Sequence, residues 1–256
     1  MNNTRRNFLK FAGLTAAGLC VASAGSVIAA GTGSTIKDGE KALKAKRWGM
    51  VIDTKKAGTK EAIDALAKAC HSVHNVPDIP GTQNVKWIWA VGFEEAFDQP
   101  NNYMDESLEK RQFAVLCNHC SSPSCVRVCP TKATYQRPDG IVAMDYHRCI
   151  GCRYCMAACP FGARSFNFME PRLHLDLANL NKSFPTRMRG VVEKCNFCVD
   201  RLADGKIPAC VEASQGALVF GDLSDPASEV RKVLREHYTI RRKPALGTEP
   251  GVYYII

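Results

Sequence analysis

Two neighbouring cysteine runs dominate the sequence: Cys117-Asn-His-Cys120-x4-Cys125-x3-Cys129-Pro130 and Cys149-Ile-Gly-Cys152-x2-Cys155-x3-Cys159-Pro160. The 256-residue chain has 13 cysteines, and all but two of them lie between residues 117 and 210. A cysteine-rich chain could carry disulfides, but disulfide frameworks do not require this alternation of CxxC, CxxxC and Cys-Pro. The spacing is that of metal-thiolate sites.

The chemistry of the two runs favours [4Fe–4S] clusters. In runs of this kind the first three thiolates bind one cluster, and the fourth, next to proline, reaches the neighbouring one. Close spacing brings several soft ligands to one small iron–sulfide cube, and Gly151 permits a tight turn around it. Structural zinc is the alternative. The crossed pairing predicts two ligand sets, defined as the first set (Cys117, Cys120, Cys125, Cys159) and the second set (Cys149, Cys152, Cys155, Cys129).

Between the two runs, Arg137-Pro-Asp-Gly140 is a turn signal flanked by short strand-like stretches. The pattern predicts a small hairpin that leads into the second run. We expect an α+β fold, with a tandem bacterial-ferredoxin-like domain of short hairpins and helices around the clusters.

A third cysteine group begins at Cys195-Asn-Phe-Cys198 and continues at Cys210, but Ser214 stands where a fourth ligand of the same kind would fall. One interpretation is an incomplete or three-iron cluster. The other uses Cys70, on a predicted amphipathic helix over residues 59–73, as the fourth ligand. An ordinary buried thiol is the alternative role for Cys70.

The chain resembles the four-cluster ferredoxin subunits of the dimethyl-sulfoxide-reductase and polysulfide-reductase type. The resemblance rests on the strand-like residues 47–53, on Cys70-His-Ser-Val-His-Asn-Val-Pro77, and on the ending Leu246-Gly-Thr-Glu-Pro-Gly-Val-Tyr-Tyr254. It implies that one of four clusters has lost all four of its cysteine ligands. Residues 56–64, where three of those cysteines would stand, contain none, and Ser214 stands at the position of the fourth. The resemblance thus implies a third set made of Cys70, Cys195, Cys198 and Cys210, and three [4Fe–4S] clusters in total.

Within that family the chain is most similar to the periplasmic iron–sulfur subunit of a membrane complex associated with sulfite reduction. The similarity implies an electron-transfer subunit, not an enzyme, and partners that include an integral membrane quinone-interacting subunit, a periplasmic multihaem cytochrome c and other complex subunits. The rival functions are an oxidoreductase that reduces a small sulfur or nitrogen compound at an open iron near Ser214, and a zinc-stabilised interaction module.

The first 30 residues resemble a twin-arginine export signal. Arg5, Arg6 and Lys10 precede a weakly apolar run rich in glycine and alanine. Export in the folded state suits a protein whose clusters are inserted in the cytoplasm. Because no other segment reaches roughly 18 apolar residues, we expect a periplasmic chain that is peripheral to the membrane.

The formal charge of +9 falls to +6 when the three cations of the signal are removed. Each oxidised cluster with four thiolates carries about −2, so three clusters bring the total to roughly zero. The basic balance therefore compensates cluster charge, and no basic stripe interleaved with aromatic residues indicates nucleic-acid binding. We expect a mature domain over 31–256, with a core over 47–224 and a C-terminal helix and tail over 225–256. Within residues 225–256, Asp225-Pro226 predicts the N-cap and the first position of the helix.

Overall fold

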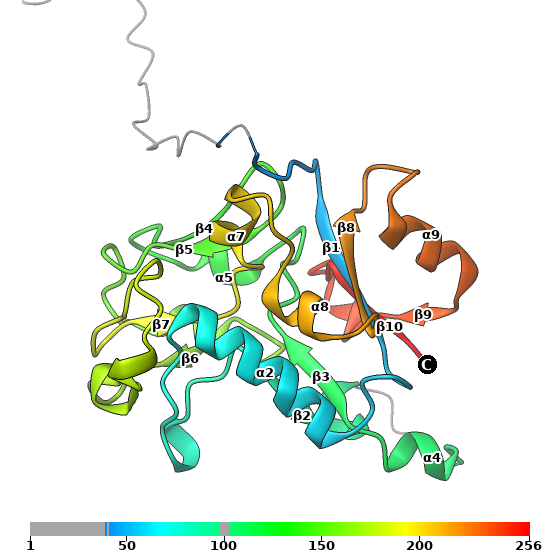
Figure 1. Ribbon diagram of the computed structural model, residues 1–256, viewed down its shortest axis with the longest axis horizontal. Helices are drawn as coiled ribbons and strands as arrows, with labels where there is room; N and C mark the ends of the chain where they lie inside the picture. The colour runs from blue at the N-terminus through cyan, green and yellow to red at the C-terminus, as the bar shows by residue number, and fades with distance from the viewer. Residues whose placement is uncertain (1–38, 40, 98–102) are drawn as a thin grey trace, which may run out of the picture. The chain divides into compact units, whose positions relative to one another are not determined.

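The computed structural model describes residues 39, 41–97 and 103–256. The predicted export signal lies outside them. Four strands form the largest sheet, in the order β8-β1-β10-β9 (Figure 1). Their bounds are Trp48–Asp53 (β1), Leu218–Asp222 (β8), Thr239–Ile240 (β9) and Val252–Ile255 (β10). Strand β1 pairs parallel with β10 and antiparallel with β8.

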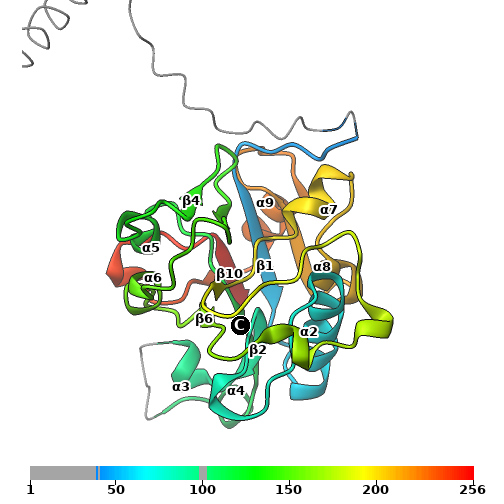
Figure 2. The ribbon, with the colours of Figure 1, turned by 90° about the vertical axis from the view of Figure 1, so that its left-hand side faces the viewer.

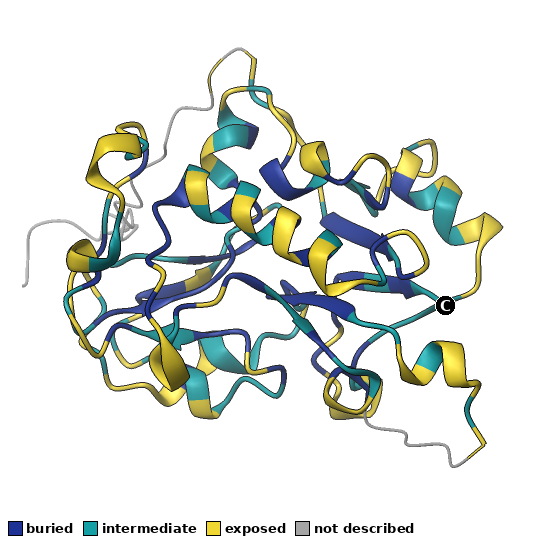
Figure 3. Ribbon diagram, turned by 60° about the horizontal axis from the view of Figure 1, so that its bottom comes forward, coloured by how far each residue is buried: buried dark blue, intermediate teal, exposed yellow. Residues whose placement is uncertain are grey.

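The predicted amphipathic helix is present as α2, Lys60–His74. It begins after Thr59, whose side chain accepts a hydrogen bond from the Ala62 backbone N–H at 3.2 Å, a cap that contributes about 1 kcal/mol. One face is buried (Ile63, Leu66, Cys70, His74), and the other is exposed, as Figure 3 shows. That buried face packs against α8 (Ala209–Ala213) and β2 (Ile88–Val91). Cys70 is therefore directed inward by the helical period itself.

Three two-stranded pairs accompany the sheet. Strand β2 pairs with β3 (Phe113–Leu116), and β6 (Ser165–Phe166) pairs with β7 (Val192–Glu193). The hairpin predicted around residues 137–140 is confirmed: β4 (Thr134–Gln136) and β5 (Val142–Met144) are antiparallel.

Short helices follow the cysteine loops. Helix α5 (Ser124–Arg127) and α6 (Tyr154–Ala157) lie side by side in Figure 2, and α7 (Val199–Ala203) follows the third loop. Among the described residues there are also the short helices α3 (Phe93–Ala96) and α4 (Glu106–Glu109) and four 3₁₀ turns. These turns are η1 (Gly81–Gln83), η2 (Pro171–His174), η3 (Leu177–Asn179) and η4 (Pro244–Leu246).

The C-terminal helix differs from the prediction at its start. Helix α9 spans Glu229–Glu236 with Ser228, and not Asp225, at the N-cap. The Asp225 carboxylate instead accepts a hydrogen bond from the Ala227 backbone N–H at 2.9 Å and closes a separate turn. The helix is therefore shorter than the sequence pattern predicts.

The mixture of helices and strands is that of an α+β protein. Tyr254 of β10 donates a hydrogen bond to the Ala114 carbonyl of β3 at 3.2 Å, which joins the large sheet to the β2–β3 pair. Tyr254 also contacts Phe97 edge to face, with ring centroids 5.4 Å apart. In the part of the chain that the structure describes, no helix is both long and apolar enough to cross a membrane.

Candidate iron–sulfur centre

None of the twelve cysteines from Cys70 onward forms a disulfide. The first set comes together around Cys120, whose thiol interacts electrostatically with Cys117, Cys125 and Cys159. Two of these cysteines come from the loop after β3, one from α5, and one from the loop after α6. The contact between α5 and α6 thus brings the late cysteine of the second run to the first three of the first run.

The second set lines one small cavity. Its walls include Cys129, Cys149, Cys152 and Cys155. The Thr134 backbone N–H donates to Cys129 Sγ at 3.5 Å. Although burial raises the pKa of the Cys129 thiol, hydrogen bonds from Thr134 and Thr131 lower it below its usual value. Cys152 is exposed, so this set reaches the protein surface.

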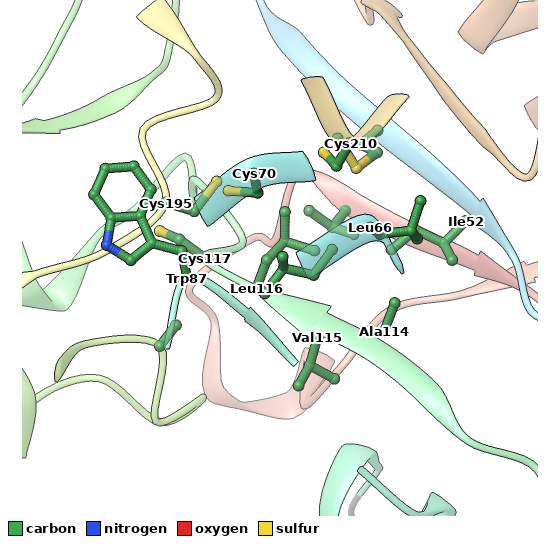
Figure 4. Packing of buried hydrophobic residues seen from close by; sticks show 14 of the residues in the cluster. Ile52, Leu66, Cys70, Trp87, Ala114, Val115, Leu116, Cys117, Cys195 and Cys210 are labelled. Carbon is green, nitrogen blue, oxygen red and sulfur yellow. The ribbon is translucent and has the colours of Figure 1, made fainter. Parts of the chain in front are cut away.

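The third set is the most enclosed. Cys70 of α2 interacts electrostatically with Cys195, Cys198 and Cys210, and these four residues are between 3% and 7% exposed. Figure 4 shows Cys70, Cys195 and Cys117 near one another beside Trp87, with Cys210 on α8 close by. The structure therefore brings Cys70 to the very group that lacks a fourth cysteine in the sequence.

The three CxxC loops share one left-handed position. In each loop the residue before the second cysteine has a left-handed conformation: His119 (φ 42°), Gly151 (φ 70°) and Phe197 (φ 53°). Only one of these is glycine, and left-handed φ in other residues costs about 1–3 kcal/mol. The shared left-handed position gives each loop a tight turn immediately before its second cysteine.

Burial opposes the ionisation of the thiols. It raises the pKa of Cys120 and Cys210 to about 12 and that of Cys198 to about 11, and it places the pKa of Cys70 well above the usual value. A buried thiolate is unfavourable unless a nearby positive charge compensates it. These four cysteines therefore favour the thiol form in the absence of metal, and the cationic core of a cluster would stabilise their thiolates.

The donors fit an iron–sulfur cluster. Each set supplies four soft sulfur ligands, and backbone N–H groups point at several of them. Phe197 N–H lies 3.5 Å from Cys195 Sγ, and Ala209 N–H lies 3.4 Å from Cys198 Sγ. Among the described residues, no three His, Cys, Asp or Glu side chains surround a point as they would around a single metal ion.

The Ser214 hydroxyl is already engaged in two hydrogen bonds. Its hydroxyl donates to the Val211 carbonyl at 2.7 Å and accepts from the Leu218 backbone N–H at 3.1 Å, so it closes the turn between α8 and β8. His119, inside the first loop, is also engaged. Its Nδ1 accepts from the Val142 N–H at 3.1 Å, and its ring stacks on Phe197 at 3.7 Å.

Sequence reasoning missed the buried cations around the cysteine sets. Arg164, Arg187 and Lys194 are each at most 5% exposed. Lys194 Nζ donates to the carbonyls of Val142 and Cys195. In the sequence these residues look like ordinary surface charges, and only the positions of Arg164 and Lys194 next to cysteine runs offered a signal.

Comparison with known proteins places the cysteine runs in a recognised domain. Residues 109–173 match the family described as a 4Fe-4S dicluster domain. This segment contains both runs and therefore the first and second sets in full. The third set lies outside it.

Three relatives match over much greater lengths. The iron–sulfur subunit 1 of the Hdr-like menaquinol oxidoreductase of Archaeoglobus fulgidus is 40% identical, over 98% of this chain and 97% of its own. The iron–sulfur cluster-binding subunit of menaquinone reductase from Nitratidesulfovibrio vulgaris is 36% identical, over 82% and 88%. The B subunit of polysulfide reductase from Wolinella succinogenes is 36% identical, over 82% and 95%.

Proposed function

Because this protein belongs to the family of electron-transfer iron–sulfur subunits of menaquinol- and polysulfide-type oxidoreductase complexes, we propose that it relays single electrons through three [4Fe–4S] clusters. It is an electron-transfer subunit, not a catalytic one. A bound [4Fe–4S] cluster supplies a reversible one-electron couple, and the protein sets its potential through burial and hydrogen bonds.

Each cysteine set would hold one cluster. The first set would use Cys117, Cys120, Cys125 and Cys159, and the second would use Cys129, Cys149, Cys152 and Cys155. The third would use Cys70, Cys195, Cys198 and Cys210. The proximity of Cys70 to the three cysteines of the last group is the single observation that carries the third assignment. The shared left-handed turn of the three CxxC loops supports it.

The sets follow one another in space. Cys195 of the third set interacts electrostatically with Cys117 of the first, and Cys155 of the second set interacts with Cys125 of the first. This order supports a linear relay in which the first set stands in the middle. The exposed Cys152 makes the second set the natural point of exchange with a partner, whereas the third set is enclosed by α2 and α8.

We propose further that the protein works beside a membrane quinone-interacting subunit and a periplasmic multihaem cytochrome c. The names of the menaquinol- and menaquinone-linked relatives support the quinone partner. The twin-arginine pattern at Arg5 and Arg6 supports periplasmic localisation after export of the folded protein. The link to sulfate or sulfite reduction rests on the sequence resemblance alone.

The test is the iron and sulfide content of anaerobically purified protein, with low-temperature EPR, beside a Cys70→Ser variant. We expect about twelve irons in the parent and about eight in the variant, or an altered signal of one cluster only. Ala67→Ser is the matched control, because it places the same side chain almost one turn earlier on the same helix. It should keep the full content.

About eight irons in the parent and in both variants would contradict the third cluster and leave Cys70 as a structural thiol. Zinc in place of iron would contradict the whole proposal. Turnover of a small sulfur or nitrogen compound by the purified protein alone would contradict the relay role.

A further inference from the structure

Arg164 lies between the first and second cysteine sets. It lies four residues after Pro160, the last residue of the second run, and its side chain is buried, with 5% of the residue exposed. Arg164 Nη1 donates a hydrogen bond to Thr134 Oγ1 at 3.1 Å and lies 3.8 Å from Met144 Sδ. Its position is therefore fixed by the β4–β5 hairpin that separates the two cysteine runs.

The residues that hold Arg164 also face the second set. Thr134 and Met144 line the same small cavity as Cys129, Cys149, Cys152 and Cys155. The guanidinium thus stands immediately behind one wall of this cavity. It also interacts electrostatically with two cysteines of the first set, Cys125 and Cys117, and with Cys155 of the second.

The positive charge of Arg164 has no carboxylate partner among the described residues. Among residues 39, 41–97 and 103–256, no carboxylate forms an ion pair with it, and its guanidinium hydrogen-bonds instead to Thr134 and to the Cys125 and Cys155 thiols. Arg187 is different, since it forms a fully buried ion pair with Glu193 at 2.6 Å. Burying a cation without an opposite charge is costly, so a negative group close to Arg164 would stabilise it.

The cysteine sulfurs supply that negative charge when a bound cluster converts them to thiolates. Burial lowers the pKa of the Arg164 guanidinium, but the negative charges of Cys125, Cys155 and Cys117 outweigh burial and raise it above its usual value. Arginine stays protonated throughout the accessible pH range, so the charge is permanent. A permanent cation beside two groups that each gain an electron favours their reduced forms.

We propose that Arg164 is the shared counter-charge of the first and second sets and holds the reduction potentials of both clusters up together. The inference rests on the proposed function, because it requires clusters on these two sets. Arg164 carries no electron itself. Because its charge acts on both couples, it raises the two potentials together and leaves the difference between them nearly unchanged.

The experiment compares Arg164→Gln and Arg164→Lys by EPR-monitored redox titration of the purified holoprotein. Gln removes the charge and should lower both potentials by at least 59 mV, which is a tenfold change in each one-electron equilibrium. Lys keeps the charge and should stay close to the parent. The cluster of the third set is an internal reference and should shift much less.

Arg242→Gln is the matched control. Arg242 is also a buried arginine, 3% exposed, but its guanidinium donates to the backbone carbonyls of Ala96 and Glu95. We expect the potentials of the first and second sets to stay near the parent values in this variant. Unchanged potentials in Arg164→Gln, a shift confined to one set, or an equal shift in the third set would each overturn the proposal.

Iron and sulfide analysis separates this inference from the proposed function. A parent protein without clusters would refute the function, whereas a loaded parent with unmoved potentials in Arg164→Gln would refute only the role of Arg164. If Arg164→Gln fails to retain clusters, Arg164→Lys decides. If Arg164→Lys retains its clusters, the positive charge is what the site requires. If both variants lose their clusters, the proposal is overturned and Arg164 has a steric role.

Discussion

At the scale of single residues, the pair Arg187–Glu193 connects the enclosed third set to the rest of the core. Both side chains are fully buried, and their charged atoms lie 2.6 Å apart. Glu193 also accepts hydrogen bonds from Trp87 Nε1 at 3.1 Å and from Asn167 Nδ2 at 2.6 Å. Arg187 donates to the carbonyls of His74 and Asn75 at the end of α2. The pair therefore fixes the helix that carries Cys70.

Replacing Glu193 with Gln should destabilise the protein strongly. The change keeps the shape and most hydrogen bonds, but it leaves the Arg187 cation buried and unpaired. Breaking one partner of a buried ion pair costs about 3–5 kcal/mol. Urea unfolding followed by far-UV circular dichroism, with the clusters intact at the start, measures the loss.

The double variant Arg187→Gln/Glu193→Gln is the control for that measurement. It removes both charges, so it should recover a substantial part of the stability lost in Glu193→Gln. A single variant within about 0.5 kcal/mol of the parent would contradict the importance of the pair, because that is the range of ordinary surface substitutions.

At the scale of elements, the second CxxC loop depends on a left-handed residue, Gly151, that is in close contact with another loop. Gly151 has φ 70°, and a Cβ there would lie 2.4 Å from the Gly190 carbonyl oxygen and 3.1 Å from the Phe166 ring. The loop between β6 and β7 therefore rests directly on the loop of the second run. A side chain at this position would have to displace backbone, not a flexible chain end.

Gly151→Ala should therefore lower the iron content toward that of two clusters, because the second set would be pushed out of register. About four irons would be lost per chain. The signals of the other two clusters should persist in low-temperature EPR. Iron and sulfide analysis of the same samples gives the count.

Gly162→Ala is the matched control for the loop. Gly162 also has a left-handed φ, 62°, but a Cβ there would meet nothing within 4 Å. We expect only the backbone cost of about 1–2 kcal/mol and a full set of clusters. Equal iron losses in the two variants would show that backbone strain, and not contact with Gly190, is decisive.

At the scale of the whole molecule, the last strand of the chain lies inside the four-stranded sheet. Strand β10 lies between β1 and β9, and both Val252 and Tyr254 have no exposed surface. The Tyr254 side chain reaches β3, which leads into the loop of the first set. The sheet and the cluster-binding half are thus joined through a residue that the sequence places far from either cysteine run.

Tyr254 should make the protein sensitive to alkaline pH. Burial raises its pKa to about 12, whereas tyrosine in an unfolded chain has a pKa of about 10. The folded state therefore holds its proton where the unfolded state loses it, and stability falls as pH rises from about 10 to 12. The total effect is on the order of 2–3 kcal/mol.

Urea unfolding of the holoprotein at several pH values measures this slope, with Tyr254→Phe as the control. The variant loses the hydrogen bond to Ala114, about 1 kcal/mol at neutral pH, but it should show a shallower fall above pH 10. Parallel slopes in the two proteins would assign the alkaline sensitivity to other groups.

Much of the architecture follows from the sequence because its causes are local. The turn residues 137–140 predict the β4–β5 hairpin, and the period of residues 59–73 places Cys70 on the inner face of α2. The cysteine spacings alone predict iron–sulfur chemistry, which the match of residues 109–173 to a 4Fe-4S dicluster domain supports. The sequence by itself therefore determined the chemistry of the cysteine runs, the β4–β5 hairpin and helix α2.

The tertiary structure decided what depends on residues far apart in the chain. The pattern over 225–256 predicts a helix and a tail. In the structure, β10 near the end of the chain pairs with β1, which lies near the start of the described residues. Arg187 and Arg164 each resemble an ordinary surface cation in the sequence until their surroundings are known. Strand pairing and charge burial are long-range properties, since neither leaves a periodic or local mark in the sequence.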